Sequence, residues 1–254
     1  MLLAIDAGNT NITLGLFREQ QLIAQWRLLT ERERSAADYV ADVCSVFERA
    51  GIDRKDVSGI AIASVVPPLD HALRQIAASF SLEPLFVDHT TDTGLKLLYH
   101  PPSALGADRI VDAVAAMNKY GTPCIVVDFG TATTFNAVSK EGEFLGGAIS
   151  PGLFTCAEAL FARAAKLPRV EFVRPPAAIG TSTVEAMQSG LYYGYAGLVD
   201  GVIARMLESM GAVSRIVATG GLAPLIADAS QYIDAIDEIL TLDGLRIVYE
   251  RSAR

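Results

Sequence analysis

The chain has 254 residues, of which 51% are hydrophobic, and a formal net charge of −8 at pH 7. This length and apolar content predict one large or two small globular domains with a sizeable core, and they exclude a disordered chain. The acidic balance argues against nonspecific binding to nucleic acid or to an anionic membrane as the main role.

Cysteine usage and the first residues predict a reduced, cytoplasmic protein. The three cysteines, Cys44, Cys124 and Cys156, lie in apolar or helical contexts without a CxxC motif, and we expect them to be reduced. The first residues contain no basic segment and reach Asp6 at once, so we expect no signal peptide. The sequence has no apolar stretch long enough to cross a bilayer.

The first half of the chain predicts an α/β unit that begins with three strands. The Gly8-Asn9 turn and the polar turn at Arg18-Glu19-Gln20 separate these strands. Ser35 is a start signal and Gly51 a stop signal for the first helix. The expected strands are 2–8, 11–17, 21–29, 60–66 and 84–87, and the expected helices are 35–50 and 69–80.

The second half repeats this order after a segment rich in Gly and Pro at 88–106 and a helix at 107–119. The stretch 166–180 contains three prolines and is expected to be a loop or flap. The expected strands are 123–128, 132–139, 143–149 and 216–219, and the expected helices are 152–164, 183–210 and 242–252. We therefore divide the chain into domains 1–117 and 118–254.

Two segments share one pattern, in which an apolar run ends in Asp, Gly follows two residues later, and a second β-prone run begins. They read Ile5-Asp6-Ala7-Gly8-Asn9-Thr10-Asn11-Ile12-Thr13 and Val127-Asp128-Phe129-Gly130-Thr131-Ala132-Thr133-Thr134. Such a turn presents a carboxylate beside backbone N–H groups and hydroxyls, which can hold a metal–triphosphate. Two ordinary hairpins would also explain the pattern. Two copies with matching flanks favour a duplicated half-domain with a nucleotide between the halves.

The sequence contains neither a GxxxxGK[ST] loop nor a GxGxxG fingerprint, so the case for a nucleotide rests on three elements. The turn from Asp6 to Thr13 would hold the triphosphate, with Asp6 orienting Mg²⁺ and its waters. The turn at Asp128 would approach the phosphates from the other half. Gly220-Gly221 would let a flat base lie on bare backbone, although a tight turn or a helix start would also explain this pair.

This order of elements resembles the sugar kinase, heat-shock ATPase and actin superfamily. A further motif, Gly106-Ala107-Asp108-Arg109-Ile110, together with the two turns and the segments 146–152 and 180–190, resembles the type III pantothenate kinase family over essentially the full length. The resemblance implies an α/β fold of two tandem ribonuclease-H-like domains. Each domain would be a mixed five-stranded sheet with flanking helices, and the two would form an interdomain cleft.

The resemblance further implies ATP-dependent phosphorylation of pantothenate to 4′-phosphopantothenate, the first step of coenzyme A biosynthesis. Transfer to an alcohol needs a proton acceptor, and Asp108 matches the catalytic Asp of the family's GxDR motif. A helix-capping role is the alternative for Asp108. Arg109 can grip a substrate carboxylate through two N–H groups, or it can form a surface ion pair of little value. Gly106 and Ala107 complete the motif at the substrate.

By the same resemblance, Tyr99 lines the substrate site, Thr183 hydrogen-bonds pantothenate and Thr131 contacts an ATP phosphate. Loop packing is the alternative for Tyr99, and an N-cap is the alternative for Thr183. Asp128 matches the family's ligand for K⁺ or NH₄⁺, which the family typically needs beside Mg²⁺. Direct coordination of Mg²⁺ by Asp128 remains the alternative.

The helix at 183–210 contains Gly190, Gly194, Gly197 and Gly201. Each glycine costs about 1 kcal/mol relative to alanine in a helix, so four of them imply a close backbone approach. The approach could be to the central sheet, or to a second copy in the homodimer that the resemblance favours.

Two other functions compete with pantothenate phosphorylation. A kinase of the same fold could act on another small hydroxylated metabolite, or a non-catalytic member could bind nucleotide as a regulatory protein. The regulatory role is disfavoured, because a protein that only binds nucleotide needs no general base, and the chain carries the full set of Asp6, Asp108, Arg109 and Asp128.

Overall fold

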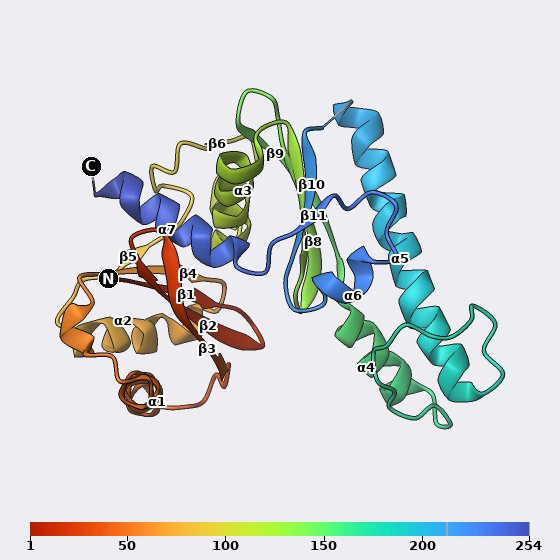
Figure 1. Ribbon diagram of the computed structural model, residues 1–254, viewed down its shortest axis with the longest axis horizontal. Helices are drawn as coiled ribbons and strands as arrows, with labels where there is room; N and C mark the ends of the chain where they lie inside the picture. The colour runs from red at the N-terminus through yellow and green to blue at the C-terminus, as the bar shows by residue number, and fades with distance from the viewer. Residues whose placement is uncertain (212, 254) are drawn as a thin grey trace. The chain divides into compact units, whose positions relative to one another are not determined.

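The computed structural model describes residues 1–211 and 213–253. The chain forms two compact units, one of Met1–Ala115 with the segment from Leu240 onward, and one of Ala116–Ile239. Figure 1 shows the elements of both units along the chain. The C-terminal segment, which the sequence assigns to the domain 118–254, therefore lies in the first unit.

The first unit is built on a mixed sheet with the strand order β3-β2-β1-β4-β5. Its first three strands form an antiparallel meander, and β4 and β5 continue the sheet in parallel with β1. The bounds are β1 Leu2–Ala7, β2 Asn11–Arg18, β3 Gln21–Leu29, β4 Gly59–Ser64 and β5 Leu85–Phe86. The expected strands are thus confirmed to within two residues at each end.

Two helices, α1 (Ala36–Ala50) and α2 (Asp70–Ser79), share one apolar core with alternate residues of β1 and β2. Ser35 caps α1 by accepting from the Asp38 N–H, and Gly51 ends it with a left-handed φ of 67°. The opposite side of the sheet receives α7 (Leu240–Ser252), whose Leu242 lies against Gly15 of β2. Short elements complete the unit: η1 Arg54–Asp56, η2 Pro67–Leu69, β6 Lys96–Leu97 and η3 Pro102–Ala104.

Helix α3 (Ala107–Tyr120) leads from the first unit into the second. Within the first unit, a Cβ on Gly244 of α7 would overlap the carbonyl of Val111 on α3, so the two helix backbones cross in contact. Thr241 adds a hydrogen bond of 2.7 Å to Asp112. The start of α3 is therefore held against α7 by close packing and a buried carboxylate.

The second unit repeats the connectivity of the first. Its strands follow the order β11-β10-β7-β8-β9 in a six-stranded sheet, whose sixth strand is the two-residue β6, one strand more than expected. Again the first three strands form an antiparallel meander and the next two run parallel to the first. The bounds are β7 Cys124–Phe129, β8 Ala132–Val138, β9 Glu143–Pro151, β10 Arg215–Thr219 and β11 Ala235–Ile236. The shared order confirms a duplicated α/β half-domain.

Helix α5 (Thr183–Met210) is the longest helix of the second unit and runs beside its sheet in Figure 1. Its buried residues, Leu191, Tyr195, Val199 and Ile203 among them, join Ile125 and Val127 of β7 in one core. Two shorter helices, α4 (Leu153–Arg163) and α6 (Ala223–Ala227), pack near it. The segment 166–180 has no regular element, as its prolines predict.

The structure also describes the state of the cysteines and the character of the helices. All three cysteines are free thiols, and burial raises the pKa of Cys124 to about 12. Within the part of the chain that the structure describes, no helix is both long and apolar enough to cross a membrane.

Candidate active site

The first Asp-x-Gly turn joins β1 to β2 and is held from outside by β3 and the residues after it. The Gly8 N–H donates to the Asn11 carbonyl at 2.9 Å, which closes the turn. The Thr30 hydroxyl donates to the Gly8 carbonyl at 2.7 Å, and Arg32 Nη2 donates to Asn9 Oδ1 at 2.9 Å. Asn9 and Thr10 are exposed at the tip. The turn is thus fixed at its base and open to a ligand.

The second Asp-x-Gly turn joins β7 to β8 and is held by β9 and α4. The Gly130 N–H donates to the Ala132 carbonyl at 3.1 Å. The Thr131 carbonyl accepts from the Gly152 N–H at 3.1 Å and from the Thr155 hydroxyl at 2.9 Å. A Cβ on Gly152 would lie 2.5 Å from the Gly130 and Thr131 carbonyl oxygens, so only glycine allows this approach.

The two turns match in register as well as in sequence. Asp6 lies opposite Thr13 in β2, and Asp128 lies opposite Thr134 in β8. Side chains alternate along a strand, so each Asp points away from the face whose apolar residues pack against α1 and α2, or against α5. Each unit therefore presents one carboxylate at the end of its first strand.

Gly220 follows β10 and brings the Gly-Gly turn against the second carboxylate. Its φ of 87° is left-handed, and a Cβ there would lie 2.5 Å from Asp128 Oδ1 and 2.6 Å from the Phe129 carbonyl. These two oxygens thus face the same small space beside Gly220. A carboxylate and a carbonyl are oxygen ligands of the type that hard cations prefer.

Asp108 lies in the first turn of α3, with its carboxyl folded back over the preceding turn. Asp108 Oδ1 accepts from the Arg109 N–H at 2.7 Å, and a Cβ on Gly106 would overlap this oxygen. Burial is the main influence on the carboxyl, and it raises the pKa of Asp108 above its usual range, although the Arg109 N–H and the Arg109 charge oppose this. Asp108 therefore combines a local hydrogen bond to the backbone with a pKa above that of an ordinary aspartate.

Arg109 is buried, with 6% of its surface exposed, so it is not the surface residue that the ion-pair alternative assumed. Its guanidinium carbon lies 5.5 Å from the centre of the Tyr99 ring. Stacking of this kind uses the face of a guanidinium, whereas its N–H groups donate along its edge. The structure thus brings Tyr99, Asp108 and Arg109 together at the start of α3.

Thr183 lies in the second unit, at the start of α5. The N-cap of α5 is Ser182, whose hydroxyl accepts from the Glu185 N–H at 3.2 Å, so the capping alternative for Thr183 is wrong. Thr181 donates from its N–H and its hydroxyl to Glu185 at 2.8 Å each. These bonds fix the helix start and leave Thr183 exposed.

A family model described as type III pantothenate kinase matches residues 2–205. The chain belongs to the type III pantothenate kinase family. The type III pantothenate kinase of Koribacter versatilis is 51% identical over 263 residues, covering 99% of this chain and 96% of the relative. That of Anaeromyxobacter sp. is 52% identical over 253 residues, covering 99% and 100%.

Solved structures with low sequence identity to this chain share its fold. Component A of the (R)-2-hydroxyglutaryl-CoA dehydratase from Acidaminococcus fermentans has a TM-score of 0.60 at 13% identity and covers 100% of this chain and 99% of that one. An inorganic polyphosphate/ATP-glucomannokinase from Arthrobacter sp. has a TM-score of 0.54 at 14% identity, with coverage of 99% and 98%. The kinase-family chain therefore has the ribonuclease-H-like, actin-like fold that its motifs predict.

In this member of the pantothenate kinase family, several residues that support the two Asp-x-Gly turns could not be predicted from the sequence. Thr30 and Arg32 reach the first turn from more than 20 positions away, and Thr155 reaches the second from 24 positions away. Only Gly152 carried a sequence signal, because it ends a glycine-containing motif. Among the described residues, no cluster of three or more His, Cys, Asp or Glu side chains could hold a metal.

Proposed function

We propose that this protein transfers the γ-phosphoryl group of ATP to the primary hydroxyl of pantothenate and so produces 4′-phosphopantothenate for coenzyme A biosynthesis. Membership of the type III pantothenate kinase family over residues 2–205 supports the reaction. The observation that carries the proposal is the cluster of Asp108, Arg109 and Tyr99, which matches an acceptor with a hydroxyl and a carboxylate.

In this proposal Asp108 is the general base. Burial raises the pKa of Asp108, which makes its ionised carboxylate a better proton acceptor than an ordinary aspartate. As the hydroxyl oxygen forms its bond to the γ-phosphorus, the bond to the β-phosphate oxygen breaks and the hydroxyl proton passes to Asp108. ADP leaves with the electron pair of the broken bond.

Arg109 binds the carboxylate of pantothenate, because a buried guanidinium can donate two parallel N–H groups to such a group. Tyr99 supports the guanidinium through its ring, and Gly106 and Ala107 bring the backbone close to the substrate. Thr183 adds a hydroxyl donor to pantothenate. Its exposed place at the start of α5 is compatible with a contact to a ligand.

The ATP phosphates are bound by the residues from Asp6 to Thr13 in the first unit and by Thr131 in the second. Asp6 orients Mg²⁺ through water, since this ion usually keeps several waters and takes few protein carboxylates. Bound Mg²⁺ would neutralise charge that develops on the phosphates. Arg32 adds a positive charge 2.9 Å from Asn9 in an otherwise acidic chain. Gly220 and Gly221 leave backbone bare for the base.

Asp128 holds a monovalent cation, K⁺ or NH₄⁺. The fit is supported by the space beside Gly220, onto which Asp128 Oδ1 and the Phe129 carbonyl both open. When bound, the cation would offset phosphate charge beside Thr131. Asp128 and Phe129 would supply the oxygen ligands, and Gly220 leaves space beside them because it has no side chain.

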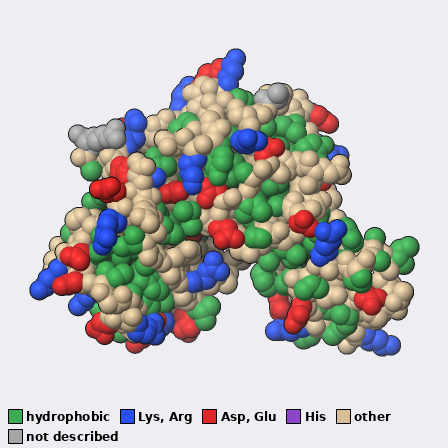
Figure 2. All heavy atoms as spheres, in the orientation of Figure 1, with side chains coloured by type: hydrophobic (Ala, Val, Ile, Leu, Met, Phe, Trp, Pro, Cys, Tyr) green, Lys and Arg blue, Asp and Glu red, His purple; other side chains and the backbone are tan. Residues whose placement is uncertain are grey.

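The protein works as a homodimer through the glycine face of α5, defined as Gly190, Gly194, Gly197 and Gly201. The first three are exposed, and no described atom outside the helix backbone lies within 4 Å of the position of their Cβ. The sheet packs on the other side of α5, so it does not explain them. Figure 2 also shows hydrophobic side chains at the surface over α4 and the start of α5, where Phe154, Phe161 and Val184 are exposed. The free cysteines support a cytoplasmic location.

A coupled assay of ADP release tests the reaction. We expect turnover of ATP to require pantothenate and Mg²⁺, and to rise on adding K⁺ or NH₄⁺. A panel of other hydroxylated metabolites serves as the control. Stimulation by another acceptor and none by pantothenate would assign the site to a different kinase reaction, and nucleotide binding without any turnover would favour a regulatory protein.

Light scattering after gel filtration tests the homodimer. Gly194→Leu places a bulky side chain in the glycine face and should yield monomers. Ala41→Leu, at an exposed position of α1, adds a leucine at a helical surface in the other unit and should leave the dimer intact. A monomeric parent protein, or a dimeric Gly194→Leu variant, would contradict this interface.

A further inference from the structure

Tyr195 of α5 reaches with its hydroxyl to two strands of the second sheet. The hydroxyl lies 2.6 Å from Thr133 Oγ1 in β8 and 3.0 Å from the Pro151 carbonyl at the end of β9. The side chain is buried, with 5% of its residue surface exposed. Burial of a hydroxyl is unfavourable unless it is hydrogen-bonded, so both bonds matter to this site.

The two partners fix the direction of both hydrogen bonds. A carbonyl can only accept, so the single proton of Tyr195 goes to Pro151. Thr133 must then donate its own proton to the Tyr195 oxygen. Burial raises the pKa of Tyr195, which keeps the phenol protonated and the arrangement intact at ordinary pH.

Both strand positions lie next to the second phosphate turn. Thr133 stands two residues beyond Thr131, and Pro151 lies opposite Ala132 in the sheet. Pro151 also precedes Gly152, whose N–H donates to the Thr131 carbonyl at 3.1 Å. The hydroxyl of Tyr195 therefore holds the two strand ends from which the turn and its support emerge.

We propose that Tyr195 is a positioning residue, which fixes the second phosphate turn through Thr133 and Pro151 and thereby sets the affinity for nucleotide. The proposal rests on the proposed function in one respect, namely that the turn at Thr131 contacts the phosphates of ATP. Phenylalanine at this position would fill the same core beside Phe129, whose ring centre lies 6.5 Å from that of Tyr195. Packing alone thus gives no reason for the hydroxyl.

The Pro151 carbonyl has two weaker neighbours that limit the expected effect. Ser150 Oγ lies 3.3 Å from it and Cys156 Sγ lies 3.8 Å from it. Loss of the Tyr195 hydroxyl would therefore loosen the strand ends without leaving this carbonyl bare. We expect a moderate loss of nucleotide affinity rather than a collapse of the unit.

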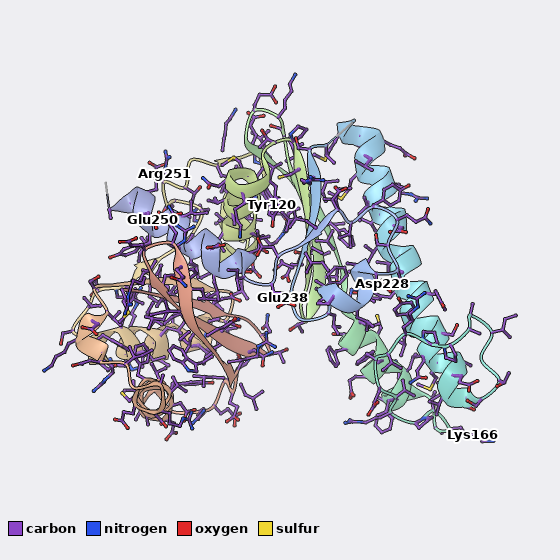
Figure 3. All side chains as sticks on the ribbon, in the orientation of Figure 1. Tyr120, Lys166, Asp228, Glu238, Glu250 and Arg251 are labelled. Atoms are coloured by element: carbon purple, nitrogen blue, oxygen red, sulfur yellow. The ribbon has the colours of Figure 1, made fainter. Side chains whose placement is uncertain are left out.

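Equilibrium binding of Mg·ATP to the full chain, measured by calorimetry without acceptor, tests the proposal. Tyr195→Phe should raise the Kd for Mg·ATP by about three- to tenfold, because one buried hydrogen-bond pair is lost. The matched control is Tyr192→Phe on the same helix. Its hydroxyl lies 3.3 Å from Asp228, which Figure 3 labels beside α6, and it should leave the Kd unchanged.

Kinetics and a second variant separate positioning from general stability. Tyr195→Phe should raise KM for ATP and leave KM for pantothenate unchanged. Thr133→Val should act in the same direction, and the double variant should bind ATP no more weakly than Tyr195→Phe alone. An unchanged Kd in Tyr195→Phe, an equal loss in Tyr192→Phe, or additive effects of the two changes would overturn the proposal. Because binding is measured without acceptor, a parent protein that binds ATP but ignores pantothenate would refute the proposed reaction and not this role.

Discussion

Gly220→Ala tests whether the Gly-Gly turn and the second carboxylate share the space that we assign to a cation. The new methyl group would lie 2.5 Å from Asp128 Oδ1 and 2.6 Å from the Phe129 carbonyl. Ordinary contact at this kind of position begins near 3.4 Å, so the carboxylate would have to move by 0.9 Å, the difference between 3.4 and 2.5 Å. The residue would also keep a left-handed φ of 87°, which alanine disfavours.

Two costs add up in this variant. The left-handed backbone costs about 1–2 kcal/mol for a residue with a Cβ. The steric overlap costs about 1–3 kcal/mol more, as for other insertions into packed sites. Gly121→Ala isolates the first cost, because Gly121 has a φ of 81° and no described atom within 4 Å of its Cβ position. The difference between the two variants measures the overlap with Asp128 and Phe129.

Thermal unfolding and cation titration are the two assays. Gly220→Ala should unfold at a lower temperature than Gly121→Ala, by about 2–4 °C for each kcal/mol of overlap. Its half-saturating K⁺ concentration should rise by about tenfold or more, since metal sites tolerate shifts of only about 0.2 Å in their ligands. Equal unfolding temperatures for the two variants, with parental K⁺ dependence in Gly220→Ala, would refute the contact and the cation assignment that depends on it.

Four further predictions concern the first unit. Asp108→Asn should lower kcat by about two to four orders of magnitude and leave substrate affinity within a few-fold, as expected for loss of a general base; near-parental kcat would remove Asp108 from that role. In differential scanning calorimetry at pH 7, the same variant should unfold at a higher temperature. Folding raises the pKa of Asp108, so ionisation of this carboxyl disfavours the folded state once the pH exceeds the pKa of the unfolded chain. An unchanged or lower unfolding temperature would contradict the burial of Asp108. In a pH–rate profile, kcat/KM should fall on the acid side with a pKa above the usual 3.9 of aspartate, since the base must be ionised, and a limb at or below that value would argue against Asp108. Gly244→Ala should lower the free energy of unfolding in urea by about 1–3 kcal/mol, because its methyl group would overlap the Val111 carbonyl. Gly51→Ala is the control, since its methyl group would meet no described atom within 4 Å and would add backbone strain alone.

The sequence predicted the elements that carry local signals. Ser35 and Gly51 bracket α1 where a cap and a left-handed stop predict them, and the two Asp-x-Gly hairpins form in matching register. These features depend on neighbours within a few positions. By contrast, the two-residue strands β6 and β11 are too short to show any hydrophobic period, and none was predicted at either place.

Long-range packing explains what the sequence did not predict. The assignment of α7 to the first unit depends on close contacts with residues far away in the chain. A Cβ on Gly59 would overlap the hydroxyl end of the Tyr249 side chain, and a Cβ on Gly244 would overlap the Val111 carbonyl. A lone glycine in a strand or helix does not identify its distant partner. The same holds for Arg109, whose burial beside Tyr99 depends on the fold of the loop before α3.

The two units share the strand order that the two turns predict, but the surroundings of their Asp residues differ. Both units place an Asp at the end of the first strand, opposite a Thr of the second, yet only the second Asp lies beside a glycine turn from a neighbouring strand. In the first unit the strand beside Asp6 continues with Ala63 and Ser64, which have side chains. The proposed base belongs to neither copy. It lies at the start of α3, which α7 contacts at Val111 and Asp112, so the place of the proposed base depends on a helix outside both turns.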